Sequence, residues 1–329
     1  MEYRPIAGGQ LKVSTVCLGC WALVGDATWG PQDKSDAIAT IRAALDAGIN
    51  FLDTAEGYGG GYSERLIGEA LGADRDKVVL GSKVSRAHLA PADLTAACEG
   101  SLKNLGTDRI DVYHIHWPSR EVPVDETVRA MESLIDAGKI GHVAVSNFGP
   151  AGLDEIVPHA VPVVNQLPYS LLWRAIEYEI LPACRSAGVP ATCYSPLMQG
   201  LLTGKFASAS DVPEGRRRTR LFSSAQPQAR HGQSGAEDET FTAVAAIVDL
   251  ARRAGLDPGA MSLAWLLGQD GVVSVIAGAR RPGQVRANAA AGDVSLPADV
   301  ARRLTEITDP LKAKLGPNAD MWQSVSRIH

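Results

Sequence analysis

The feature that most constrains the fold is a regular alternation of short aliphatic runs with longer, alanine-rich amphipathic stretches. Short β-branched runs favour strands, and a helix after each strand favours a parallel sheet built from crossover units rather than hairpins. The predicted strands span Thr15–Gly19, Asn50–Asp53, Val78–Lys83, Ile110–His116, His142–Ser146, Pro162–Gln166, Ala191–Tyr194 and Val273–Ile276. The predicted helices that follow them span Ser35–Ala47, Ser63–Leu71, Pro91–Leu105, Val124–Ala137, Pro150–Val157, Ile176–Ala187, Asp238–Ala254 and Pro282–Ala291.

Eight strand–helix units across 329 residues fit a single (β/α)8 TIM barrel better than a doubly wound sheet with a second domain. We therefore predict one α/β barrel domain over residues 1–329. Two extra helices, Asp257–Leu267 and Pro297–Thr308, are expected outside the eightfold repeat. A long irregular segment, Gln199–Ala236, follows the seventh strand and carries the basic run Arg216–Arg220. A loop of this length is typical of a functional lid or a mobile insertion.

Composition excludes several classes of protein. The formal net charge is -5, which provides no global basic field for nucleic acid or anionic lipid. No uncharged run approaches the about 18 to 20 residues that a membrane-spanning helix needs. The five cysteines are scattered and odd in number, as in reduced proteins. We predict a cytoplasmic protein, a monomer or small homo-oligomer, with no nucleic-acid or membrane partner.

Polar side chains stand where predicted apolar strands end. Asp53 ends the second strand, Lys83 the third and His116 the fourth, and Tyr58 lies in the loop after Asp53. Each alone has an ordinary structural explanation as a cap, an exposed lysine tip, a core histidine or a packing tyrosine. In a barrel, however, the carboxyl ends of strands form one face, which carries the active site. The four groups together therefore favour a catalytic site.

These four residue types suit the protonation of a carbonyl oxygen. A tyrosine, with an ordinary pKa of about 10, becomes an effective acid or base when a nearby cation stabilises its anion, and Lys83 would be that cation. Asp53 would hold the ammonium of Lys83 in place. His116 would donate a hydrogen bond to the oxygen that gains negative charge.

The segments that carry these residues are similar to the signatures of the aldo-keto reductases, NADPH-dependent carbonyl reductases, and the resemblance covers nearly the whole chain. The matching segments are GINFLDTAEGYG at 48–59, VLGSK at 79–83, LGTDRIDVYHIHW at 105–117 and GKIGHVAVSNF at 138–148. The resemblance places the catalytic aspartate, tyrosine, lysine and histidine at Asp53, Tyr58, Lys83 and His116. It implies reversible hydride transfer between NADPH and an aldehyde or ketone, a small-molecule substrate. Separately from the resemblance, stacking by Trp21, Trp29 and Trp117 would suit a sugar-like or aromatic carbonyl compound.

The resemblance also implies a set of cofactor contacts. Ser146, Asn147 and Gln166 would bind the nicotinamide carboxamide, and Tyr194 would stack on its ring. The segment YSPLMQGLLTGK at 194–205 would line the pyrophosphate, and IAGARRPGQVRAN at 276–288 would complete the site beside a helix start, where anions are favoured. The full predicted set is Trp21, Asp53, Ser146, Asn147, Gln166, Tyr194, Ser195, Leu197, Gly200, Lys205, Gly278, Ala279, Arg280, Gln284 and Asn288.

Arg280 would bind the adenosine 2′-phosphate, because a guanidinium can bind phosphate in a bidentate manner. This favours NADPH, with NADH as the alternative cofactor. Four positions depart from the family pattern: His114, Ala144, Ala277 and Ala287 stand where glutamine, glycine, proline and glutamate are common. The change at Ala287 affects an expected adenine contact.

Three tryptophans are candidates for the substrate wall, alongside Tyr58 and His116. They are Trp21 after the first strand, Trp29 in the following loop and Trp117 beside His116. Packing explains each equally well. The basic run at Arg216–Arg220 would close over the cofactor, bind a phosphorylated substrate or be solvated.

Two other functions remain open on the sequence alone. A cofactor-binding regulatory subunit of the same fold, like channel-associated β-subunits, would bind NADPH and turn over slowly. A metal-dependent barrel hydrolase or isomerase would need clustered ligands, but only His114 and His116 are spaced to share a strand face. We therefore predict no metal site.

Overall fold

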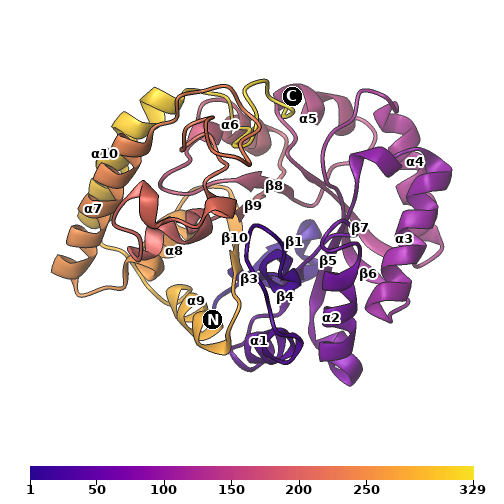
Figure 1. Ribbon diagram of the computed structural model, residues 1–329. Coiled ribbons are helices and arrows are strands. Elements are labelled where there is room, and N and C mark those ends of the chain that lie inside the picture. Colours follow the sequence, from indigo (N-terminus) through magenta and orange to yellow (C-terminus); the bar gives the residue numbers. More distant parts are fainter.

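A computed structural model describes residues 1–329, and eight parallel strands form a closed barrel at its centre (Figure 1). The last strand pairs with both the first and the seventh strand of the barrel, which closes the sheet. The predicted (β/α)8 barrel is confirmed. Its strands are β3 (Val16–Gly19), β4 (Phe51–Asp53), β5 (Val79–Val84), β6 (Ile110–Ile115), β7 (Ile140–Ser146), β8 (Asn165–Pro168), β9 (Ala191–Tyr194) and β10 (Val272–Gly278).

Helices surround the barrel, and local signals in the sequence start several of them (Figure 1). The Asp33 carboxylate accepts hydrogen bonds from the first backbone N–H groups of α1, which satisfies donors that have no partner within the helix. Helices α3, α5, α8 and α9 each have proline in the first turn, where no N–H is needed. The helices are α1 (Lys34–Asp46), α2 (Tyr62–Leu71), α3 (Pro91–Leu105), α4 (Val124–Asp136), α5 (Pro150–Ile156), α6 (Ile180–Ser186), α7 (Glu237–Ala254), α8 (Pro258–Leu267), α9 (Pro282–Ala291) and α10 (Ala298–Leu315). None of them is both long enough and apolar enough to cross a membrane.

The seventh barrel helix is α8 and not α7, so the predicted assignment of these two helices was wrong. Helix α8 packs against β10 and α9, and nearly all of its residues are buried. Helix α7 instead lies outside, against α8 and α10 (Figure 1). The sequence pattern favoured α7 as the barrel helix because α7 is amphipathic, with one apolar face. Helix α8 is apolar on most sides, as expected of a helix covered on both faces.

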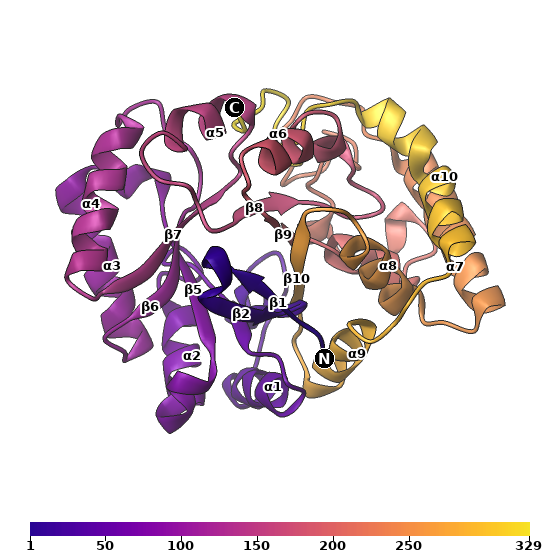
Figure 2. The ribbon, with the colours of Figure 1, turned by 180° about the vertical axis from the view of Figure 1, so that it is seen from behind.

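A β-hairpin that the sequence analysis missed closes the amino-terminal end of the barrel. Strands β1 (Tyr3–Ile6) and β2 (Leu11–Ser14) pair antiparallel and lie across that end (Figure 2). Ile6 and Val13 are buried there against Cys17, Phe51 and other apolar residues of the barrel interior. This end of the barrel is therefore sealed, and the other end is left for a site.

The segment Gln199–Ala236 is held against the end of the chain. Arg220 is buried, and its guanidinium donates to the backbone carbonyls of Leu315, Asn318 and Asp320. Arg220 is therefore structural, and it fixes the loop and the C-terminal segment against each other. All five cysteines are unpaired and buried.

We expect Ile6→Ala to lower the free energy of unfolding by about 2–4 kcal/mol, because the truncation leaves a cavity in the apolar seal. Val325→Ala is the matched control: Val325 is 81% exposed, so its loss should change the free energy by less than about 0.5 kcal/mol. Urea denaturation measures both. Equal values for the two variants would contradict a packing role for the hairpin.

Candidate active site

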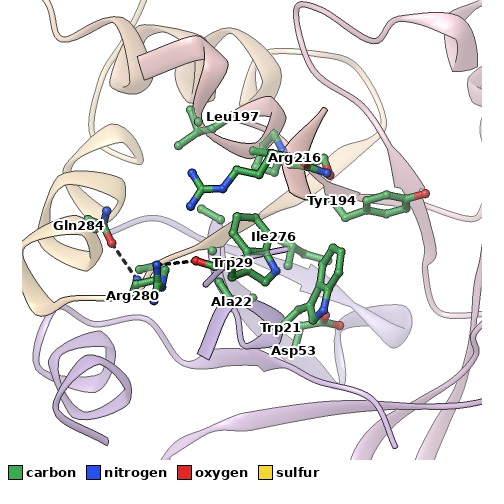
Figure 3. Close-up of a pocket in the computed structure, with 18 of the residues that line it drawn as sticks. Trp21, Ala22, Trp29, Asp53, Tyr194, Leu197, Arg216, Ile276, Arg280 and Gln284 are labelled. Carbon is green, nitrogen blue, oxygen red and sulfur yellow. Dashed lines mark hydrogen bonds between the residues drawn. The ribbon is translucent and has the colours of Figure 1, made fainter. Parts of the chain in front are cut away.

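A cavity of about 740 Å³ opens at the carboxyl ends of the barrel strands (Figure 3). Apart from Lys83, every predicted site residue lines it, including all three tryptophans. Lys83 is completely buried beneath the cavity. The structure therefore brings together residues from all parts of the chain, as the strand-end argument required.

The base of the cavity is a buried ion pair between Lys83 and Asp53. The Lys83 ammonium donates to Asp53 Oδ1 at 2.7 Å and to the Thr54 carbonyl at 2.6 Å. The amide of Gln166 donates to the other carboxylate oxygen at 2.8 Å. Burial acts to lower the pKa of Lys83, but the charges of Asp53 and Tyr58 and the hydrogen bond to Asp53 raise it overall. Lys83 is therefore a fixed positive charge.

Tyr58 stands above this pair, with the Lys83 ammonium 5.1 Å from its ring centroid. Burial raises the pKa of the Tyr58 hydroxyl, and the positive charge of Lys83 only partly opposes the effect of burial. The prediction that Lys83 favours the tyrosinate was right about the direction of its contribution, but burial is the larger effect. Tyr58 is therefore protonated at neutral pH.

His116 follows β6 and faces Tyr58, with the two rings 5.9 Å apart at 79°. Burial and the nearby charge of Lys83 hold the pKa of His116 well below its ordinary value. The imidazole is thus neutral at pH 7. A neutral ring can donate one hydrogen bond to a substrate oxygen without acting as a charged acid.

The predicted nicotinamide contacts form one hydrogen-bonded network. The Tyr194 hydroxyl donates to Asn147 Oδ1 at 2.9 Å, and the Asn147 amide donates to the His116 carbonyl at 3.1 Å. Ser146 Oγ donates to the Gln166 carbonyl at 3.0 Å. Asn147 has a φ of 64°, a left-handed conformation that asparagine tolerates better than most residues. The network fixes these side chains before any ligand binds.

The far end of the cavity is rich in cations. Lys205, Arg216 and Arg280 line it, and none makes an ion pair with a carboxylate. Burial, and then the charges of Arg216 and Arg280, lower the pKa of Lys205, which shows that the three act on one another. The start of α9 faces the same space (Figure 3). Uncompensated cations beside a helix start are suited to phosphate groups, so this end of the cavity fits a dinucleotide.

Arg280 does not present a free guanidinium fork. The group donates to the Trp29 carbonyl at 2.7 Å (Figure 3). It also donates to Gln32 Oε1 at 2.8 Å and to the Pro31 carbonyl. The bidentate phosphate contact assumed from the sequence is therefore not available in this geometry. The acceptors are neutral, so the charge of Arg280 stays uncompensated.

Two of the predicted tryptophans form an aromatic wall beside Tyr58. Trp21 stacks on Tyr58 with ring centroids 6.0 Å apart, and Trp29 meets Trp21 edge-on at 5.4 Å. Trp117 lies apart from this wall, and the guanidinium of Arg327 covers its ring at 3.8 Å.

The sequence placed the start of the loop after β9 in the cofactor site but did not assign one role to its basic run. The contribution of the C-terminal segment was not predicted. The additional charged, amide and aromatic residues that line the cavity from these two segments are Gln199, Arg216, Arg218, Gln228, Arg230, Trp322, Gln323 and Arg327. Their signal in the sequence was the basic run itself, whose partners lie about 100 residues further along.

His114 is buried in the barrel, where its Nδ1 lies 3.1 Å from the Ser82 carbonyl. Burial, with the charge of Lys83, lowers its pKa to about 4, so the ring is neutral at pH 7. No group of three or more histidine, cysteine, aspartate or glutamate side chains is arranged to hold a metal ion.

The fold and this site define a barrel whose open end joins an Asp–Tyr–Lys–His cluster to a cation-lined groove. The Aldo/keto reductase family model matches residues 15–309, so the chain belongs to the aldo-keto reductase family and is an oxidoreductase by class. The general activity of that family, the reduction of small carbonyl compounds, applies to the chain.

Relatives in this family carry names that imply different functions. Aldo-keto reductase YhdN of Bacillus subtilis (strain 168) is 36% identical over 298 residues, 87% of each chain. The NADH-specific methylglyoxal reductase of Escherichia coli (strain K12) is 31% identical, over 95% of this chain and 100% of its own. A probable voltage-gated potassium channel subunit beta of Oryza sativa subsp. japonica is 32% identical, over 89% and 92%.

Solved structures agree with the family. The glycerol dehydrogenase AKR11B4 of Gluconobacter oxydans matches with a TM-score of 0.81 at 31% identity, over 96% of each chain. An aldo/keto reductase of Klebsiella pneumoniae in complex with NADP and acetate matches with a TM-score of 0.73 at 32% identity, over 92% of this chain and 93% of its own.

We expect Lys83→Met to lower the free energy of unfolding by about 3–5 kcal/mol, because it leaves the Asp53 carboxylate buried without its cation. The double variant Asp53→Asn/Lys83→Met should lose less than the sum of the two single variants. Lys77→Met, at a side chain that is 72% exposed, is the control and should change little. Urea denaturation of the wild type, Asp53→Asn, Lys83→Met and the double variant gives the coupling energy between the two residues. Strictly additive losses would contradict a stabilising pair.

Proposed function

We propose that this protein reduces aldehydes or ketones with NADPH and that Tyr58 is the proton donor. The observation that carries the proposal is the convergence of Tyr58, Lys83 and His116 at one end of the cavity that holds the cation-rich groove. A carbonyl group between Tyr58 and His116 would meet two neutral donors. This arrangement serves the protonation of an oxygen while its carbon is reduced.

A nicotinamide cofactor bound in the groove supplies the hydride to the carbonyl carbon. Tyr58 gives its hydroxyl proton to the carbonyl oxygen, and Lys83 stabilises the tyrosinate that remains until solvent returns the proton. His116 donates a hydrogen bond that orients the same oxygen. Asp53 keeps Lys83 charged and in position, and Gln166 holds Asp53.

The preference for NADPH over NADH rests on the uncompensated cations Lys205, Arg216 and Arg280. An adenosine 2′-phosphate adds about two negative charges, which such a cluster favours. Structures in the family hold NADP, whereas one relative is named as NADH-specific. We place Arg280 beside the 2′-phosphate. Hydrogen bonds to the Trp29 carbonyl and to Gln32 Oε1 hold its guanidinium in a fixed orientation.

A cofactor-binding regulatory subunit is the second candidate, because one relative is named as a potassium channel subunit. Such a protein would bind NADPH tightly and turn over slowly. Steady-state turnover of carbonyl compounds at rates typical of enzymes, about 1 per second or faster, decides for the reductase.

We expect Tyr58→Phe to lower kcat by about 10²–10⁴-fold while the Kd for NADPH stays unchanged, because the substitution removes only the proton donor. Steady-state kinetics and tryptophan quenching measure the two quantities. Tyr113→Phe is the matched control, because Tyr113 is a buried tyrosine of β6 that does not line the cavity. Retained turnover in Tyr58→Phe would exclude Tyr58 as the donor.

We expect titration with NADPH to give a lower Kd than titration with NADH, followed by tryptophan quenching. Arg280→Gln should remove most of this difference by raising the Kd for NADPH about tenfold or more, because one cation beside the phosphate is lost. Arg286→Gln, an exposed arginine of α9 outside the cavity, is the control. An unchanged ratio in Arg280→Gln would move the role to another cation, and no binding of either cofactor would contradict the proposed function.

A further inference from the structure

Arg218 is a cation at the cavity wall with no carboxylate partner in the protein. Its guanidinium lies between the rings of Trp21 and Trp322, at 5.2 Å and 4.7 Å from their centroids. It is half-buried, its Nε has no hydrogen-bond partner, and it makes no salt bridge. A half-buried guanidinium that no carboxylate neutralises keeps its terminal N–H donors for an anion that enters the cavity.

The carboxylate whose charge acts on Arg218, Asp26, and the Asp320 carboxylate beside Trp322 both have other partners. Asp26 accepts from the Trp21 indole at 2.9 Å through one oxygen, and from the backbone N–H groups of Thr28 and Trp29 through the other. Asp320 is held in a bidentate contact by Arg327, at 2.7 Å and 3.0 Å. Arg230, which also lines the cavity, adds a second positive charge near Arg218.

Arg218 belongs to the reacting end of the cavity and not to the phosphate-binding end. Trp21, which it covers, stacks directly on Tyr58. The cations at the other end act on one another, whereas the charges that act on Arg218 are those of Asp26 and Arg230. The guanidinium and the proposed proton donor therefore lie against the same indole ring.

Resting on the proposed carbonyl reduction, we propose that the substrates of this protein are aldehydes or ketones that carry a carboxylate or phosphate group, and that Arg218 binds this anion. The planar guanidinium matches both anions through paired N–H donors. The two tryptophans fix its plane, so little conformational freedom is lost on binding. The bound anion would set the distance at which the carbonyl reaches Tyr58 and His116.

The test compares matched pairs of substrates that differ in charge. With NADPH and the wild-type protein, kcat/KM is measured for 4-oxobutanoate against butanal, and for glyceraldehyde 3-phosphate against glyceraldehyde. We expect the charged member of at least one pair to be preferred, and the two pairs distinguish a carboxylate from a phosphate. Arg218→Gln should then lower kcat/KM for the preferred anion about 10- to 100-fold, mainly through KM, and lower it much less for the neutral partner.

Two further variants keep the test specific. Arg218→Lys keeps the charge but loses the fork, so it should recover part of the preference for the anion. Arg217→Gln is the matched control, because Arg217 is the adjacent residue of the same basic run but does not line the cavity. The Kd for NADPH should be the same in all variants.

Several results would overturn the inference. One is that the wild-type protein has no preference for either anion. Another is that Arg218→Gln loses activity equally on charged and neutral substrates. A third is that Arg218→Gln weakens NADPH binding by the same factor as it lowers kcat/KM for the anionic substrate. The last two would assign Arg218 to packing or to the cofactor. Absence of turnover on all four compounds together with absence of cofactor binding would instead contradict the proposed function itself.

Discussion

The ion pair between Lys83 and Asp53 is the interaction on which the rest of the site depends. Both side chains are withdrawn from water, with side-chain exposures of 0% and 3%. Two charges in such a place are tolerated only when further hydrogen bonds satisfy them, and Thr54 and Gln166 provide these. Lys83 then acts on the groups above it: its charge makes the tyrosinate of Tyr58 less unfavourable, and together with the larger effect of burial it lowers the pKa of His116.

Two features of the barrel produce this buried ion pair: the register between its strands and the apolar seal at its amino-terminal end. Asp53 lies beside Gly81, and Lys83 follows Gly81 by two residues on β5, so the two charged side chains point to the same side of the sheet. At the opposite end, Ile6 and Val13 exclude water from the barrel interior. The interior thus changes from apolar at the hairpin to charged at the open end, and desolvation of the pair is a direct consequence of the packing beneath it.

Local sequence signals were sufficient for the barrel and for the core of the site. Asp53, Lys83 and His116 interrupt apolar runs at strand ends, and parallel strands bring their ends to one face. The hairpin was missed because each of its strands has only four residues and one of them contains Pro5. The barrel helix was assigned to α7 instead of α8, because the amphipathic pattern of α7 is the usual signal for a helix with one covered face. Helix α8 is apolar on most sides because it is covered on both faces.

Contacts between distant segments determine the partners of Arg218 and Arg280, which the sequence alone could not predict. Arg218 meets Trp322 across about 100 residues of chain, and no pattern at either position reveals the other. Arg280 is a similar case, because its guanidinium donates to the Trp29 carbonyl, which belongs to the loop after β3. Both cases concern where a cation finds its acceptors, which depends on loop geometry and not on residue type.

The distribution of charge carries more functional information than its sum. The formal net charge of -5 gives no attraction for anions at long range. Yet Lys205, Arg216, Arg218 and Arg280 gather around one cavity without carboxylate partners. Because salt screens charges beyond about 8–10 Å, an approaching anion responds to these cations and not to the acidic remainder of the surface. An acidic protein can therefore hold a site that concentrates a dinucleotide at one end and, by the same physics, an anionic substrate at the other.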